Sequence, residues 1–187
     1  MAPIWLVALV LGIAAPERAV PCSESIGGTR FPYLGSNDLK ERYRLVLGVV
    51  SVPPALREQV IRNGEWPWWP YFFKAGLIVR ATGQSVVITV PRAWRGRAAI
   101  AWGYGGHGVF SSLRIAGCRA LPSQGFAYSG GFYLRSAPAC MPLIFRVGRR
   151  SATVRFGLGQ KVRSPRGSHE RAVRCRTKSR CFAGSPS

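Results

Sequence analysis

Acidic residues and histidines are scarce in this sequence, and this scarcity limits the chemistry it can perform. The 187 residues include 27 Lys and Arg, but seven Asp and Glu and two His. Between residues 22 and 162 the acids are Glu24, Asp38, Glu41, Glu58 and Glu65. All five lie in the first third of that stretch, and none is next to a histidine. The sequence therefore offers little support for hydrolytic chemistry.

A serine hydrolase triad needs a serine, a histidine and an orienting acid. The chain could meet this need with Asp38, His107 and one of two serines. Those serines are Ser111 and Ser112, and no catalytic motif surrounds them. A secreted hydrolase that uses residues near His107 is therefore kept only as an alternative.

Metal and cofactor sites are not expected either. His107 and His169 are the only histidines, and no pair of cysteines has the spacing of zinc ligands. Residues 103–108 are rich in glycine, but they lack the spacing and the following helix of a phosphate-binding motif. We predict no metal and no cofactor, and we interpret residues 103–108 as a connection between strands.

No hydrophobic run is long enough to span a bilayer, which takes about 20 apolar residues. The longest run covers 12 residues, 4–15, and Pro16, Glu17 and Arg18 follow it. Its length is typical of the apolar part of a signal peptide, although no Lys or Arg precedes it. We predict that residues 1–21 are a signal peptide or an N-terminal apolar anchor. The protein would then be secreted or held at the extracellular side of the cell envelope; the alternative is a buried N-terminal strand or helix.

The net charge of +20 is the strongest feature of the composition. Arg greatly outnumbers Lys, and Ala, Gly and Pro are abundant, so part of this charge reflects GC-rich codons. Whatever its origin, such a surface attracts polyanions, including anionic lipid, acidic cell-envelope polymers and, non-specifically, nucleic acid.

Residues 22–162 are predicted to form one all-β, sandwich-like domain of about seven or eight strands with little helix. Apolar and β-branched residues mark strands at 43–52, 76–80, 85–90, 98–102, 109–116 and 132–134. The gap at 81–84 contains a glycine and predicts a hairpin between its flanking strands. Residues 55–63 show helical spacing and predict a short surface helix. Residues 22–40 are expected to be irregular.

The last two strands have the clearest pattern. Leu143, Phe145 and Val147 alternate with Ile144 and Arg146, and the same period continues over residues 152–158 after a turn at 148–150. This alternation predicts a hairpin with one buried face and one solvated face. The residues that follow differ in composition: 163–187 are basic and almost free of apolar residues, so we predict a disordered tail. Two interpretations stay open, a native polycation or an altered reading frame.

Five cysteines in a chain expected to be exported predict disulfides. Cys118 follows one predicted strand and Cys140 precedes another, so a bridge between them would join neighbouring strands at a gain of about 3 kcal/mol. Cys22 would then pair with Cys175 or Cys181.

Two groups of residues are candidates for ligand binding. The first is the aromatic cluster 66–73 (WPWWPYFF), in which Trp66, Trp68, Trp69 and Tyr71 are the candidate ligand-binding residues. Flat rings on a β scaffold stack on sugars or lie at a membrane interface, but large rings also fill the core of a small β protein. The alternative interpretation is therefore that this group is core.

The second candidate group is the basic stretch 92–97 (RAWRGR), in which Arg92, Trp94 and Arg95 are the candidate ligand-binding residues. Charge combined with stacking suits an acidic glycan or a single-stranded nucleic acid. The alternative is a solvated arginine-rich face, and the same two interpretations apply to Arg146, Arg149, Arg150 and Arg155.

Five short segments carry a resemblance to a known group: residues 74–77 (KAGL), 102–103 (WG), 130–134 (GGFYL), 140–143 (CMPL) and 154–157 (VRFG). They resemble small exported proteins of high-GC Gram-positive bacteria, over less than half of the chain. No activity is known for that group, so the resemblance implies export and no functional site. It also implies a cysteine soon after Gly159 that pairs with an early one, whereas Lys161 and Val162 stand there in this chain.

Together these features predict an exported, monomeric β domain that acts by binding acidic cell-envelope polymers or glycans, or as a passive envelope component, and they favour a non-catalytic protein over an enzyme. A hydrolase and a nucleic-acid-binding protein are the alternatives.

Overall fold

The structure is a computed structural model that describes residues 17–33, 43–53, 55–56, 68–103, 108–121 and 123–159. In this part the chain forms fourteen strands and two short 3-10 helices, η1 (Cys22–Glu24) and η2 (Arg92–Trp94). The prediction of an all-β fold is confirmed. The number of strands was underestimated because several are only two to five residues long.

The strands form three sheets. Sheet A contains, in spatial order, β1 (Arg18–Val20), β10 (Ser112–Ile115), β8 (Val86–Thr89), β13 (Ala139–Val147), β14 (Arg150–Leu158) and β5 (Ala55–Leu56). Sheet B contains β2 (Gly27–Arg30), β11 (Gln124–Tyr128), β7 (Leu77–Arg80), β4 (Val50–Val52) and β3 (Arg44–Val46). Sheet C contains β6 (Tyr71–Lys74), β12 (Gly130–Leu134) and β9 (Ala98–Trp102).

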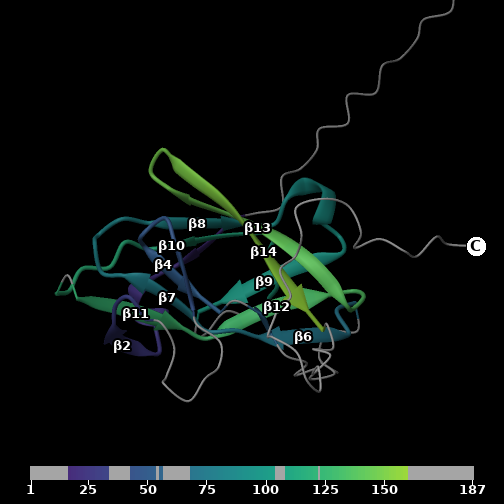
Figure 1. Cartoon of the computed structure of the whole chain (residues 1–187), viewed down its shortest axis with the longest axis horizontal. Coiled ribbons are helices and arrows are strands. Elements are labelled where there is room, and N and C mark those ends of the chain that lie inside the picture. Colours follow the sequence, from purple (N-terminus) through teal and green to yellow (C-terminus); the bar gives the residue numbers. More distant parts are fainter. Residues whose placement is uncertain are drawn as a thin grey trace, which may run out of the picture.

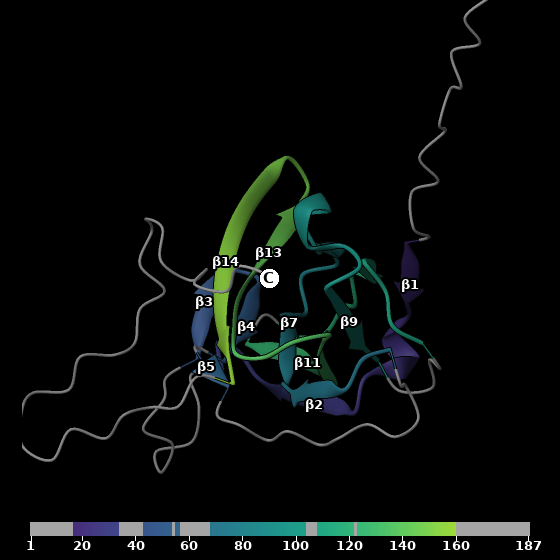
Figure 2. The same ribbon diagram turned by 90° about the vertical axis from the view of Figure 1, so that its right-hand side faces the viewer.

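Sheet A lies over the other two sheets, so the molecule has two β layers (Figure 1). Sheets B and C lie side by side in the lower layer (Figure 1), and the turned view shows β13 and β14 above β2 and β11 (Figure 2). One hydrophobic core lies between the layers and takes side chains from all three sheets. Phe145 of sheet A, Tyr128 of sheet B and Phe132 of sheet C are each at most 1% exposed. This arrangement is that of a sandwich-like domain.

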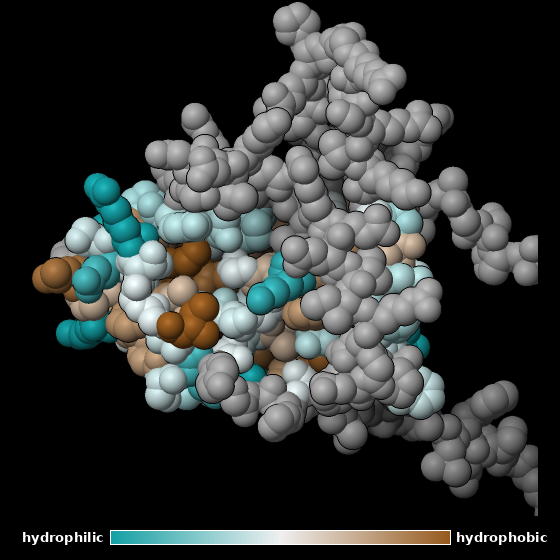
Figure 3. Space-filling view, turned by 90° about the horizontal axis from the view of Figure 1, so that it is seen from below, coloured by the Kyte–Doolittle hydropathy of each residue, from teal (hydrophilic) through white to brown (hydrophobic). Residues whose placement is uncertain are grey.

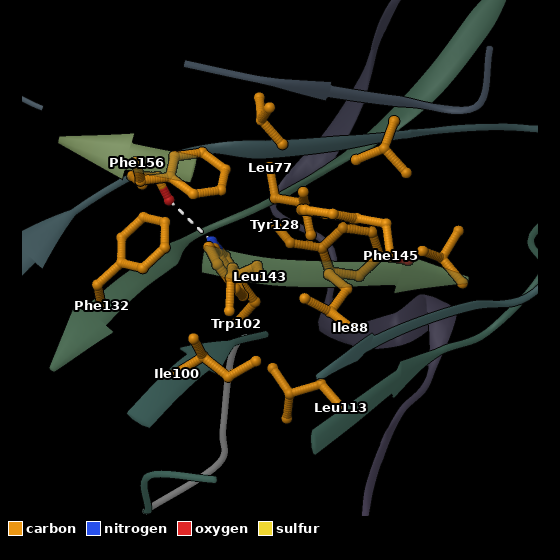
Figure 4. Packing of buried hydrophobic residues seen from close by; sticks show 14 of the residues in the cluster. Leu77, Ile88, Ile100, Trp102, Leu113, Tyr128, Phe132, Leu143, Phe145 and Phe156 are labelled. Carbon is orange, nitrogen blue, oxygen red and sulfur yellow. Dashed lines mark hydrogen bonds between the residues drawn. The ribbon is translucent and has the colours of Figure 1, made fainter. Parts of the chain in front are cut away.

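Aromatic residues fill the part of the core above sheet C (Figure 4). The ring centroids of Phe132 and Phe156 are 4.9 Å apart, and Trp102 meets Phe132 edge to face at 5.3 Å. The Trp102 indole Nε1 donates a hydrogen bond of 2.9 Å to the carbonyl oxygen of Ala75. The buried indole is therefore satisfied and fixed in place.

The predicted hairpin at the end of the chain's β region is confirmed as β13 and β14, which pair over nine residues each. Phe145 and Val147 face the core while Arg146 is exposed, as the alternation requires. The turn contains Gly148 at a φ of 56°, a left-handed conformation that glycine adopts without strain.

Residues 43–52 form a hairpin, β3 and β4, and not the single strand that their composition predicts. The turn between these strands has Leu47 at a φ of 52° and Gly48 at 72°. Two consecutive positive φ values match the twist of a tight hairpin. Leucine rarely adopts such a φ, so composition gave no sign of this turn.

The predicted hairpin across residues 81–84 is wrong. β7 belongs to sheet B, where it pairs with β11 and β4, whereas β8 pairs with β10 and β13 in sheet A. The chain crosses from one layer to the other at this gap. The predicted helix at 55–63 is also wrong at its start, since residues 55–56 form β5, parallel to β14; residues 57–63 lie outside the described residues.

Ordered β structure begins before the predicted domain start at Cys22. β1 pairs in parallel with β10, and its Val20 is 1% exposed. Residues 22–40 are not wholly irregular either, because Gly27–Arg30 form β2. The hydrophobic run 4–15 and the tail 163–187 lie outside the described residues. Within the described residues, no helix has the length and apolar character needed to cross a bilayer.

Disulfides are present, but the predicted pairing is wrong. Cys118 bonds to Cys22, with their Cα atoms 5.8 Å apart, and not to Cys140. Cys118 follows β10 and Cys140 lies in β13, and β8 stands between these two strands, so the two cysteines do not belong to neighbouring strands. β1 and β10 are parallel and end at the same edge, so the residues just after them meet there. Cys140 is also disulfide-bonded, and its partner lies outside the described residues.

Candidate functional site

Two candidate groups that are distant in the sequence meet at one end of sheet C. Tyr71 pairs with Leu134, which pairs in turn with Ala98. The segment that contains Trp68 and Trp69 leads into this end of the sheet through β6, and the segment 92–97 leads into it through β9. Neighbouring strands are about 4.8 Å apart, so the two segments enter the sheet about 10 Å from each other.

Two arginines lie over indoles of these segments, and one of them, Arg135, connects the two segments. The guanidinium carbon of Arg97 lies 4.7 Å from the ring centroid of Trp94, and that of Arg135 lies 5.5 Å from the ring centroid of Trp69. Both distances are within the range of cation–π attraction. The backbone N–H of Arg135 donates a hydrogen bond of 3.0 Å to the carbonyl oxygen of Arg97. We call the set of Trp68, Trp69, Trp94, Arg97 and Arg135 the aromatic–arginine surface.

Local backbone structure holds Trp94 and Arg97 in this arrangement. The short helix η2 begins after Pro91, and the Trp94 N–H donates to the Pro91 carbonyl at 2.8 Å. The Arg97 N–H donates to the Trp94 carbonyl at 3.0 Å, and the Arg97 guanidinium donates to the Ala93 carbonyl at 2.9 Å. The Arg97 side chain therefore folds back over the indole, and its position is set before any ligand binds.

The surface is accessible to a partner. Trp68 is 73% exposed, the largest exposure among the large apolar side chains of the described part. Arg97 and Arg135 are exposed, while Trp69 and Trp94 are half-buried. The arrangement presents the edges and faces of flat rings together with planar guanidinium groups.

Other predicted site residues divide between this surface and the core. Tyr71 is half-buried and packs against the core, so it supports the surface from below. Phe73, the last residue of the aromatic cluster 66–73, is fully buried. For this residue the alternative interpretation, that the cluster is core, is confirmed. Arg92 and Arg95 are exposed on either side of Trp94 and extend the basic area. Trp66 lies outside the described residues.

The residues of the alternative hydrolase are not brought together in the described part. His107 and Asp38 lie outside it. The Ser112 hydroxyl lies 3.2 Å from the Thr89 hydroxyl, and the buried Ser111 hydroxyl has no hydrogen-bond partner among the described residues. No cluster of three His, Cys, Asp or Glu residues that could hold a metal ion occurs in the described part.

Carboxylates in the described part are few and already engaged. Glu17 forms an ion pair of 2.6 Å with Arg114, and Glu24 forms one of 2.6 Å with Arg18. Arg18 also lies over the ring of Phe110, at 5.4 Å from its centroid. These two acids stabilise the β1 edge of the fold and are not poised as general bases.

The remaining surface is mixed. A shallow hollow between β2 and β11 is lined by Gly28, Thr29, Arg30, Ser123 and Gln124. Two exposed apolar side chains, Ile26 and Leu121, lie next to these strands in the sequence. Seen from below, apolar side chains form small separate groups among polar ones (Figure 3). Small groups of this kind are normal on a monomeric protein and do not indicate a large apolar partner.

Arg135 is the site residue that sequence reasoning missed. Arg97 belongs to the predicted basic stretch 92–97, but its position over Trp94 was not predicted, although the i, i+3 spacing across a turn could have indicated it. Arg135 is an isolated arginine 66 positions after Trp69. Only the pairing of β12 with β6 and β9 brings Arg135 to this surface.

Comparison with known protein families, with curated proteins and with solved structures finds no match. The resemblance to small exported proteins of high-GC Gram-positive bacteria therefore stays a prediction.

Proposed function

We propose that this protein is an exported, non-catalytic β-sandwich-like protein that binds acidic polymers or glycans of the cell envelope. The observation that supports this proposal most strongly is the aromatic–arginine surface. In it, Arg97 lies over Trp94, Arg135 lies over Trp69, and the exposed Trp68 stands beside Trp69.

The chemistry of this surface matches that class of ligand. Aromatic rings pack against the apolar faces of sugar rings, and guanidinium groups pair with phosphate or carboxylate in a planar, bidentate geometry. Because each guanidinium is already held over an indole, less side-chain entropy is lost on binding. An acidic glycan offers both a ring to stack and a charge to pair.

Export has separate support. The Cys22–Cys118 disulfide is typical of proteins that fold in an oxidising compartment. The fold adds a constraint on any removal of the leader, since β1 begins at Arg18 and is paired with β10. Cleavage should leave Arg18 in the mature chain, which places the cut before this residue and not immediately before Cys22.

The experiment is a binding titration, measured by isothermal calorimetry. The ligand is a sugar-bearing polyol-phosphate polymer of the wall teichoic acid type. We expect the affinity to fall steeply between about 50 and 500 mM salt. Binding releases counterions that are condensed on the polymer, and this release is less favourable when the salt concentration is higher. Trp68→Ala should weaken binding about five- to tenfold at constant salt, through loss of stacking. The matched control is Leu121→Ala, which removes another exposed apolar side chain, 65% exposed and outside this surface.

Dextran, a neutral glucose polymer, tests whether the acidic group matters. Equal affinity for dextran and for the phosphate polymer, or an affinity that salt does not change, would contradict the proposal. If Trp68→Ala and Leu121→Ala lose the same amount of affinity, the aromatic–arginine surface is not the binding site.

A further inference from the structure

The β13–β14 hairpin extends beyond the sheet that contains it. β13 pairs with β8 only at residues 144–146, and β14 pairs with β5 only at residues 157–158. The tip, residues 147–151, therefore has no strand beside it other than its own partner in the described part. Figures 1 and 2 both show this ribbon projecting from the upper layer.

The exposed side chains on this ribbon are strongly basic. Arg146, Arg149, Arg150 and Arg155 are all exposed. The two acids of the described part, Glu17 and Glu24, pair with other arginines, and none lies between Glu65 and Glu170 in the sequence. No carboxylate in the described part neutralises the ribbon.

The ribbon continues into a broad face of sheet A. One row of residues crosses the four strands β10, β8, β13 and β14 at the same register. Its members, in order, are Arg114, Val87, Arg146 and Ser151. Four strands at about 4.8 Å spacing make this row about 14 Å wide. A parallel row carries the hydroxyls of Ser112, Thr89 and Thr153. Val87 and Ile144 interrupt these rows, and Arg114 is paired with Glu17, so the cations of this face that no described carboxylate neutralises lie on the hairpin, beginning at Arg146.

We propose that the β13–β14 hairpin and the adjoining face of sheet A are a second docking surface, specific for a flexible chain of repeated phosphate groups. This inference deepens the proposed function and rests on it: the aromatic–arginine surface would engage sugar and charge, and the hairpin would engage charge alone. The exposed side chains of the ribbon are arginine, serine and threonine, and its two aromatic side chains, Phe145 and Phe156, are buried. Guanidinium groups pair with phosphate in a bidentate geometry, and the ribbon exposes no ring on which a base could stack. A phosphate polymer outside the cell is therefore the partner assigned to the ribbon, in keeping with the export that the proposed function includes.

The test uses the full-length chain and long-chain inorganic polyphosphate as the probe. The double variant R149Q/R150Q removes two tip arginines, and the matched control R30Q/R119Q removes two exposed arginines from other strands and loops. We expect R149Q/R150Q to bind about tenfold more weakly at low salt, and to reduce the slope of log affinity against log salt by about 1.4. The control should keep nearly the wild-type slope, and R149E/R150E should bind more weakly still.

The outcomes separate this inference from the proposed function. If the wild type binds polyphosphate but R149Q/R150Q and R30Q/R119Q behave alike, the hairpin inference is wrong while the proposed function stands. If the wild type binds neither polyphosphate nor the teichoic acid polymer, the proposed function is wrong as well. If a DNA duplex binds more tightly than polyphosphate with the same dependence on Arg149 and Arg150, the partner assigned to the hairpin is wrong.

Discussion

Tyr128 is a buried phenol whose surroundings make it sensitive to alkaline pH. It is 1% exposed, and its hydroxyl lies 3.4 Å from the Sγ atom of Cys118. Burial, with a smaller contribution from the charge of Glu24, raises the pKa of Tyr128 from 10.0 to about 12. The folded protein therefore holds the phenolic proton more tightly than the unfolded chain does.

This shift predicts a loss of stability at high pH. Below pH 10 both states keep the proton, and between pH 10 and about 12 the unfolded state releases it first. The free energy of unfolding should therefore fall as pH rises through this window, by about 2–3 kcal/mol for this group. Denaturant titrations at several pH values measure it. Tyr128→Phe, which has no hydroxyl to titrate, should show a smaller fall; an identical fall would contradict the assignment.

At the residue scale, sequence reasoning located the surface aromatics but could not sort them. Trp68, Trp69 and Tyr71 stand within four positions, yet Trp68 is exposed, Trp69 lies beneath Arg135 and Tyr71 packs against the core. Their side-chain directions depend on where β6 begins and on which strand lies beside it. Neither fact is local, so composition alone left both interpretations open.

At the scale of elements, the N-terminal edge of sheet A depends on a covalent tie. β1 has three residues and a single neighbour, β10. The Cys22–Cys118 bond closes the end of this pair across a sequence separation of 96. Such a short edge strand gains little from its own hydrogen bonds, so the disulfide is the main restraint on it.

Removing this disulfide should therefore destabilise the domain. In the chain-entropy model a loop of this length is worth about 4–5 kcal/mol, and we expect C22A/C118A to lose about 4 kcal/mol in denaturant unfolding. Ser23→Ala, a change at an exposed neighbour, should have almost no effect. Digestion without reduction should release a peptide pair that joins Cys22 to Cys118. A pair that joins Cys118 to Cys140 would contradict this fold.

Elements with a strong local pattern were predictable. β14 alternates apolar and polar residues over most of its length, β13 does so over residues 145–147, and the glycine of their turn adopts the conformation expected of it. β7 and β8 were each identified as strands, but their partners were not. The four residues 81–84 are long enough either to form a hairpin turn or to cross from one layer to the other. The spacing of the strands in the sequence therefore could not distinguish these two connections.

At the scale of the whole molecule, charge is distributed over two surfaces with different chemistry. The aromatic–arginine surface combines rings with cations, while the β13–β14 hairpin exposes cations without exposed rings. We expect the net charge of +20 to attract polyanions to both surfaces. The sequence predicted the class of partner from this charge, but the grouping of the cations follows from the order of strands in sheets A and C.

The most direct test of the account is a nuclear magnetic resonance titration of the indole N–H signals with the teichoic acid polymer. The signals of Trp68, Trp69 and Trp94 should shift on addition of the polymer. The signal of Trp102 should stay in place, because this indole is 2% exposed and donates to the Ala75 carbonyl. Shifts confined to sheet B, with no change at Trp68, Trp69 or Trp94, would contradict the assignment of this surface as the binding site.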